Sequence, residues 1–200
     1  IGTSAFSDCK SMTTINIPTS LTSIRSSAFF NCRSLTSLSL PNSITSIGSY
    51  AFEDCRNLTS INIPTSLTTI ANGTFTDCSS LTSITIPNGV TTIGDRAFED
   101  CEAATSITIP ASVTSIGSRA FAYCSSPTSV DIPSSVISIG DEAFNYIKNI
   151  NYTGTAGTET ETWGALTRNG IIDGDFMFGD ATKTQLTVYR GNGGSVTIPN

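Results

Sequence analysis

The stretch AFEDCRNLTSINIPTSLTTIANG occupies residues 51–73, and a pattern of the same length repeats on both sides of it. Phenylalanine recurs every 23 residues, at Phe6, Phe29, Phe52, Phe75, Phe98, Phe121 and Phe144. Cysteine follows three residues later in six copies, at Cys9, Cys32, Cys55, Cys78, Cys101 and Cys124. Proline follows twelve residues after the phenylalanine, at Pro18, Pro41, Pro64, Pro87, Pro110 and Pro133. Three residue types in one phase show that the chain is a stack of a single repeated unit.

One repeat is too small to fold alone. Its seven apolar positions would contribute roughly 10 to 20 kcal/mol if each buried side chain gives about 1.5 to 3 kcal/mol. Ordering the backbone costs about 1 to 2 kcal/mol for every residue of the repeat. Neighbouring repeats must therefore pair their strands and cover each other's apolar layers, which predicts a solenoid whose stability grows with repeat number.

Each repeat has three segments with different periodicities. Leu38 and Leu40 alternate with polar residues, and a proline follows, which predicts a strand that ends at the proline. Ile44 and Ile47 are spaced by three, which fits either a short extended segment or a turn. Ala51–Cys55 places its apolar residues at helical spacing, which predicts a short helical or 3-10 turn opposite the strand.

Departures from the pattern set the predicted boundaries. Ala104 and Pro127 replace a leucine, so we expect looser packing there. Ile147 replaces the cysteine, Ile150 still fits the leucine position, and the pattern stops after Tyr152. Residues 1–152 are therefore predicted to form the repeat array.

The remainder of the chain has a different composition. Residues 153–169 are rich in Gly, Thr and Glu and are predicted to be a loop or linker. Residues 170–200 are predicted to form a β-hairpin that leads into a second array, because 196–199 return to the repeat pattern. The chain starts and ends within repeats, so we expect it to be part of a longer protein. It has no signal peptide pattern and no apolar run near the roughly 20 residues of a membrane span.

The spacing L-x-x-I-x-I-P-x-x-V-x-x-I-G-x-x-A-F-x-x-C resembles the BspA-like, or Treponema pallidum type, leucine-rich repeat over residues 1 to about 152. The D-F, L, Y-x-G-N-G-G-x-V-x-I-P pattern near the end is similar to units that introduce arrays in that family. The resemblance implies a right-handed solenoid with a parallel sheet on one face, in secreted or surface-anchored proteins. Several members are adhesins or bind host proteins, but function does not follow from fold alone.

The composition narrows the possible functions. Asp and Glu number 16 against 10 Lys and Arg, for a net charge of -6, so the chain has no basic footprint for nucleic acid or an anionic membrane. Histidine is absent, which excludes a Ser-His-Asp triad or a Cys-His pair. We therefore expect no enzyme activity and no cofactor.

The cysteines and glycines have structural interpretations. A cysteine spacing of 23 residues is unlike a zinc site, so we favour a ladder of free, buried thiols, with disulfides between rungs as the alternative. Gly48, Gly94, Gly117 and Gly140 are expected at positions of positive φ. Sequons at Asn57, Asn72 and Asn151 would matter only in a eukaryotic secretory protein.

Acidic side chains line one edge of the predicted stack. Asp8, Asp54, Asp77 and Asp100 precede cysteines, and Asn31 and Tyr123 take this position in the other two repeats. A calcium-binding ladder is one interpretation. We favour hydrogen bonds to nearby backbone N–H groups, a role that asparagine can also fill.

The outward positions of the predicted strands are the candidate binding face. They are short, polar and nearly uncharged: Thr14, Asn16, Ser37, Ser39, Ser60, Asn62, Ser83, Thr85, Ser106, Thr108, Ser129 and Asp131. The face lacks Trp, Tyr and Arg anchors, so it would bind weakly or through many copies, or it would serve only solubility.

Three functions fit this solenoid. The first is an extracellular or cell-surface adhesion and protein-interaction module with a protein or glycan ligand. The second is a structural spacer that holds other domains away from a cell envelope. The third is an ice-binding surface, suggested by the rows of Ser and Thr, although the rows also contain Asn and Asp.

Overall fold

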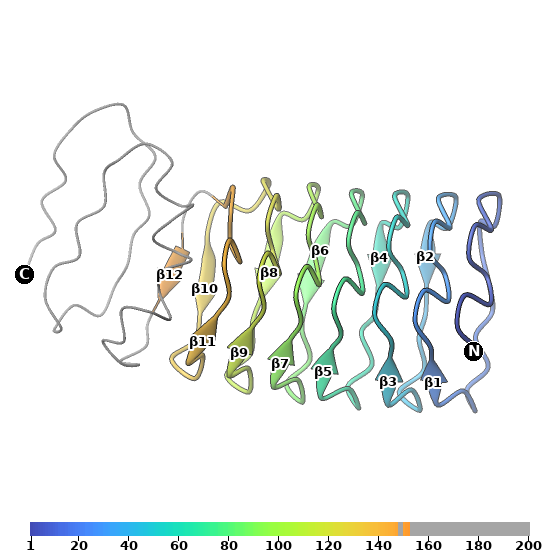
Figure 1. Ribbon diagram of the computed structural model, residues 1–200, viewed down its shortest axis with the longest axis horizontal. Helices are drawn as coiled ribbons and strands as arrows, with labels where there is room; N and C mark the ends of the chain where they lie inside the picture. The colour runs from blue at the N-terminus through green and yellow to red at the C-terminus, as the bar shows by residue number, and fades with distance from the viewer. Residues whose placement is uncertain (148–149, 153–200) are drawn as a thin grey trace, which may run out of the picture.

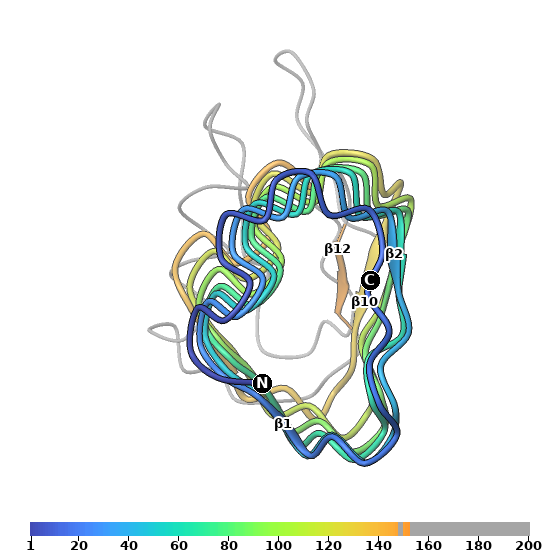
Figure 2. The same cartoon turned by 90° about the vertical axis from the view of Figure 1, so that its right-hand side faces the viewer.

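The computed structural model describes residues 1–147 and 150–152, which form a stack of similar coils (Figure 1). Viewed along the stack, the coils superpose closely on one another (Figure 2). The predicted repeat solenoid with parallel strands is confirmed. The predicted linker at 153–169 and hairpin at 170–200 lie outside the described residues.

Two rows of short parallel strands run along the stack. The first row follows the predicted strand and consists of β2 (Ser37–Leu38), β4 (Ser60–Ile61), β6 (Ser83–Thr85), β8 (Ser106–Thr108), β10 (Val130–Ile132) and β12 (Ile150–Tyr152). The second row consists of β1 (Ser23–Ile24), β3 (Ser46–Ile47), β5 (Thr69–Ile70), β7 (Thr92–Ile93), β9 (Ser115–Ile116) and β11 (Ser138–Ile139). Ile47 therefore lies in an extended segment, whereas Ile44 closes a turn by donating its N–H to the Pro41 carbonyl at 3.1 Å.

We call residues 25–36, and the equivalent residues at 23-residue intervals, the turn side. The helical turn predicted here is wrong, because the described residues contain no helix. Instead, successive amides alternate in direction: Phe29 N donates to Ala51 O of the next coil at 2.7 Å, and Phe30 N donates to Ser27 O within its own coil at 3.1 Å. Positive φ angles at Ser27 (55°) and Asn31 (59°) interrupt the helical sequence of dihedrals.

The core is a set of ladders with one residue from each coil. The seven phenylalanines that recur at 23-residue intervals stack with ring centroids 5.2 to 5.5 Å apart. The six cysteines are free, as expected. Five of their thiols donate to the carbonyl of the phenylalanine in the preceding coil, as in Cys55 Sγ to Phe29 O at 3.3 Å. The thiol thus donates a hydrogen bond to a buried carbonyl oxygen. An apolar side chain at this position would leave that oxygen with one hydrogen bond fewer.

The glycines at the coil corners have a different role from the one predicted. Gly73 is the glycine with positive φ among the described residues, so Gly48, Gly94, Gly117 and Gly140 do not supply that conformation. They allow close approach of two coils instead. A Cβ atom on Gly117 would lie 2.5 Å from Asp95 N and 2.6 Å from Gly94 C.

Replacing Gly117 with alanine is expected to lower the free energy of unfolding by about 1 to 3 kcal/mol, the usual cost of overpacking. The added methyl group would force two backbones apart. Urea denaturation followed by circular dichroism measures the change. Gly2→Ala is the matched control, because no atom lies within 4 Å of its added Cβ. Equal midpoints for the two variants would contradict the close-packing explanation.

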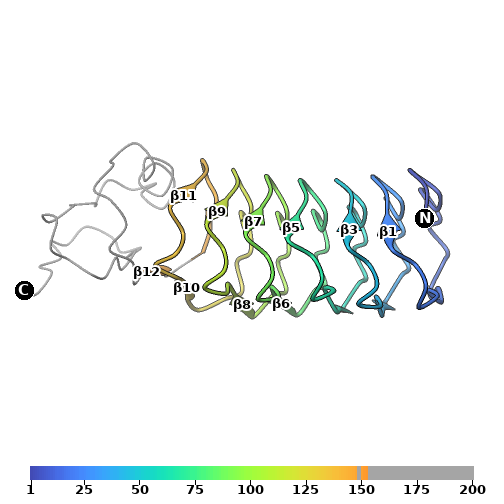
Figure 3. The same ribbon diagram turned by 90° about the horizontal axis from the view of Figure 1, so that it is seen from below.

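A natural methyl group at this corner coincides with a break in the second row. Ala71 takes the position of Gly48 and Gly94, whose N–H groups bond to Ile24 O and Ile70 O at 2.9 and 2.8 Å. Among residues 1–147, no corresponding bond joins Ala71 N to Ile47 O. The second row accordingly divides into β1–β3 and β5–β7–β9–β11 (Figure 3).

The last described coil is shorter than the others. Val130 pairs with Ile150, an offset of 20 residues, whereas Ile84 pairs with Ile107 at the regular 23. Ile150 was expected at the leucine position that Pro127 holds in the preceding coil, and this prediction is wrong. Because this coil is three residues shorter, Ile150 lies beside Val130, the first residue of β10, instead. Ala104 and Pro127, the expected weak points, are both buried.

Candidate binding surfaces

The structure places the predicted binding face along the first strand row. All twelve of its residues are exposed. Parallel pairing sets Ser83 beside Ser106 and Thr85 beside Thr108. The first row consists of three such pairs, β2–β4, β6–β8 and β10–β12. Its outward side chains form an uncharged polar surface, apart from Asp131 near its end.

Some side chains on this face hold the coils together. Asn62 accepts a hydrogen bond from Leu40 N at 2.8 Å and donates one to Leu40 O at 2.6 Å, so its amide replaces a strand-to-strand backbone pair. Beside the face, Thr59 donates its hydroxyl to Thr36 O at 3.0 Å, and Thr82 donates to Thr59 O at 3.2 Å. The abundance of Thr and Asn therefore has a structural cause in addition to any contact with a ligand.

The charges of the array lie elsewhere. Within the described residues, every Asp, Glu, Lys and Arg except Asp131 lies on the turn side. The tyrosines of coils three, six and seven, Tyr50, Tyr123 and Tyr146, lie there too. The two strand rows and the turn side therefore present surfaces of different chemistry.

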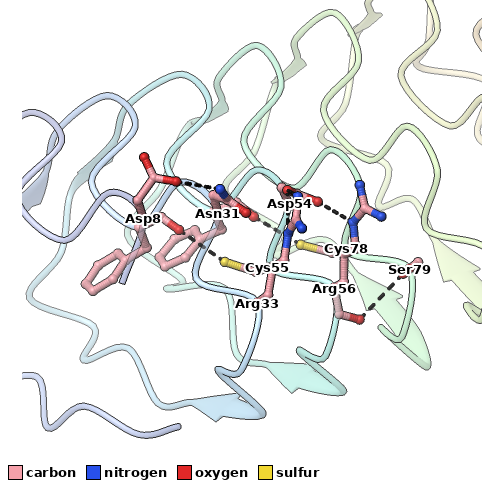
Figure 4. A network of polar contacts seen from close by, with 10 residues as sticks. Asp8, Asn31, Arg33, Asp54, Cys55, Arg56, Cys78 and Ser79 are labelled. Carbon is pink, nitrogen blue, oxygen red and sulfur yellow. Dashed lines mark hydrogen bonds and ion pairs between the residues drawn. The ribbon is translucent and has the colours of Figure 1, made fainter. Parts of the chain in front are cut away.

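A polar network links the first coils of the turn side (Figure 4). Asn31 Nδ2 donates to Asp8 Oδ1 at 2.5 Å, and Lys10 Nζ lies 3.5 Å from the same carboxylate oxygen. Asp54 accepts hydrogen bonds from Arg33, at 2.7 Å from Nη2, and from Arg56. Burial alone would raise the pKa of Asp54, but the two arginines outweigh it and hold the pKa below its ordinary value.

Other carboxylates of the turn side have raised pKa values. Burial raises the pKa of Asp100, and the charges of Asp77 and Glu102 raise it further. Burial also raises the pKa of Glu53, with Asp77 and Asp54 adding to the effect. Within 1–147 and 150–152, no three Cys, Asp or Glu side chains are arranged to hold a metal ion, so the geometry does not support the calcium-binding ladder.

Backbone conformation explains the row of residues that precede the cysteines. Asp8, Asn31, Asp54, Asp77 and Asp100 all have φ between 57 and 62°. Asp and Asn tolerate this left-handed region better than most residues do. We expected these side chains to accept hydrogen bonds from nearby backbone N–H groups. The side-chain partners seen for Asp8 and Asp54 are asparagine and arginine instead.

Two tyrosines interrupt this row, and sequence reasoning missed their significance. Tyr123 and Tyr146 have φ of 61 and 70°, and their rings stack with centroids 4.7 Å apart. Tyr146 is 40% exposed. The available signal was the replacement of Asp or Asn by an aromatic residue at the same place in two consecutive repeats.

The sequence is similar to a described repeat family. The profile of the BspA type leucine rich repeat region matches in six copies, over residues 1–128 and 91–160. A comparison with curated protein sequences finds no match. In the described residues, no helix has the length and apolar character needed to cross a membrane.

Solved bacterial structures resemble the fold. A leucine-rich repeat protein from Bacteroides ovatus is 26% identical, with a TM-score of 0.64 over 74% of this chain and 45% of that one. A leucine rich cell surface protein from Faecalibacterium prausnitzii is 35% identical, with a TM-score of 0.59 over 67% of this chain and 39% of that one. The chain thus spans less than half the length of either structure.

Proposed function

The chain belongs to the BspA type leucine-rich repeat family, and from this premise we propose that it is a cell-surface module that binds a partner protein along its first strand row. The family and the cell-surface protein that it resembles support a protein-interaction repeat. The observation that carries the choice of face is that its twelve positions recur in six consecutive coils and are all exposed. A partner could contact many equivalent positions at once, which compensates for weak individual contacts.

A location outside the cell and an adhesive role are part of the same proposal. Free thiols are compatible with it, because each is buried among its neighbours or partly buried at Cys9. The module is proposed to act by binding and without catalysis: the chain has no histidine to activate its many serines. Its net charge of -6 disfavours nucleic acid as the partner.

Substituting arginine for Ser60 and Ser83 tests the binding face. Both residues lie near the centre of the first row, where a bulky charge would block a flat partner surface. Binding to an array of immobilised extracellular proteins and glycans is measured first with the unchanged chain. We expect the double variant to lose at least about tenfold in affinity for a protein hit, or about 1.4 kcal/mol.

The matched control carries arginine at Ser46 and Thr69, which are exposed positions of the second row. It adds the same charge to the second strand row and should bind as the unchanged chain does. Equal losses in both variants would contradict a specific face. Hits confined to glycans would replace the protein partner by a carbohydrate.

A structural spacer is the second candidate, supported by the rigid continuity of the phenylalanine ladder. It predicts that the Ser60 and Ser83 double variant keeps the function of the unchanged chain. A chain that lacks one 23-residue coil should lose that function. The ice-binding alternative is tested by thermal hysteresis, for which the Ser83 and Thr85 positions and their neighbours provide the regular rows.

A further inference from the structure

The stacked tyrosines occupy a backbone position that suits them poorly. Their left-handed conformation is uncommon and energetically unfavourable for a bulky residue. Five coils place Asp or Asn at this position, so a better-suited residue was available. Two consecutive aromatic residues at a disfavoured, solvent-facing position indicate a role at the surface.

One ring of the stacked pair lies next to the acidic coils. Tyr123 and Tyr146 stack along the direction of the solenoid, with 24° between their planes. The face of Tyr123 turned away from Tyr146 is therefore directed toward the preceding coil, where Asp100 holds the equivalent position. The two coils meet closely here, since Asp100 N donates to Ala122 O at 2.9 Å. A carboxylate and an aromatic ring therefore occupy adjacent positions of the row.

The charges around these positions favour a cation. Asp77 and Glu102 both act to raise the pKa of Asp100, and no basic group contributes to its shift. Arg119 lies near Tyr123, but its own charge is matched, with Nε 2.6 Å from Glu142 and Nη1 3.8 Å from Glu99. Asp77 has Arg56 as a cationic neighbour, whereas Asp100 and Glu102, which lie nearer to the tyrosines, form none of the ion pairs seen in the described part of the chain.

We propose that Asp77, Asp100, Tyr123 and Tyr146, the acid-tyrosine row, bind an extended, arginine-bearing segment of a partner protein. A guanidinium group stacks on tyrosine through cation–π attraction while its N–H groups bond a carboxylate in pairs. Lysine has no planar group that could stack on the tyrosine ring and bond the carboxylate in pairs at the same time. The row lies on the turn side, so it is independent of the first-row face and would remain if that face proved inert.

Substitution with asparagine separates binding from folding. Asn31 already adopts the same backbone conformation in coil two, so Asp77→Asn, Asp100→Asn and Tyr123→Asn should fold. Tyr123→Asn should keep or raise the melting temperature, because it replaces a disfavoured residue. The charge-matched control is Asp8→Asn with Asp141→Asn, which removes two exposed carboxylates that lie outside both the acid-tyrosine row and the first-row face.

Titration calorimetry of the whole chain with a hexa-arginine peptide at low salt measures the effect. We expect the Asp77 and Asp100 double variant, and separately Tyr123→Asn, to weaken binding about fivefold or more. The control double variant should stay within about twofold, and hexa-lysine should bind more weakly than hexa-arginine. The proposal is overturned if the control loses as much affinity as the Asp77 and Asp100 variant, or if Tyr123→Asn binds both peptides as the unchanged chain does.

Discussion

Replacing Phe75 with alanine is expected to lower the free energy of unfolding by about 3 to 5 kcal/mol, the range measured when a buried aromatic ring is removed. The ring is fully buried and stacks on Phe52 at 5.5 Å and on Phe98 at 5.2 Å. Each stacked pair contributes about 0.5 to 1.5 kcal/mol beyond burial, and the substitution removes two pairs. In a solenoid, this damages both interfaces of the central coil at once.

Phe6→Ala is the matched control for this prediction. Phe6 belongs to the same ladder, but it is only partly buried and stacks on one described ring, Phe29. We expect less than half the loss seen at Phe75, measured by chemical denaturation. Equal losses would contradict the idea that stability comes from neighbours on both sides of a coil.

The repeat and its first strand row follow from the sequence because they rest on side-chain chemistry with a strict period. Leu38 and Leu40 alternate with serines, so apolar burial specifies the strand. The predicted end at the proline is wrong for β2, which ends at Leu38. The free cysteines were also predictable, since a small apolar residue at one ladder position has an identical neighbour in each adjacent coil.

The turn side was harder to predict, because its shape depends on backbone dihedrals and not on apolar spacing. Phe29 and Cys32 are spaced as they would be in a helix. However, Ser27 before them and Asn31 between them adopt positive φ. Serine gives little sign of that conformation. The role of Gly117 was missed for a related reason. Its contact is with the backbone of another coil, which the pattern within a single repeat does not reveal.

The candidate surfaces differ in how far the sequence reveals them. Exposure of the first row followed from alternation, and all twelve positions are exposed. Whether that face binds a partner stays a prediction. The acid-tyrosine row could not be found from composition, because Tyr123 and Tyr146 become a pair only when consecutive coils stack.

Raising the pH above about 9 is expected to unfold the array, because its buried thiols resist ionisation. Burial, with smaller contributions from neighbouring cysteines, raises the pKa of Cys55 from 9.0 to about 12 and that of Cys32 to about 11. Burial also raises the pKa values of Cys78 and Cys101 well above the ordinary value. In the unfolded chain, these thiols lose their protons near pH 9, whereas the folded chain must keep them.

The sign follows from this difference in proton binding. Between the unfolded and folded pKa values the folded state holds more protons, so stability is complete below pH 9 and falls as the pH rises toward 12. A shift of three units at Cys55 corresponds to about 4 kcal/mol once the pH passes 12. Because several thiols share the effect, we expect cooperative loss of circular dichroism within this window.

The Cys55→Val variant isolates the contribution of one thiol. Valine keeps the site apolar and cannot ionise, although it leaves Phe29 O without the thiol hydrogen bond. The variant should therefore be less stable at pH 7, yet its free energy of unfolding should fall less steeply between pH 9 and 12. Chemical denaturation at several pH values measures both slopes. If the free energy of unfolding falls equally steeply with pH in both chains, removing one thiol has no effect on alkaline unfolding. Ionisation of other groups would then drive it.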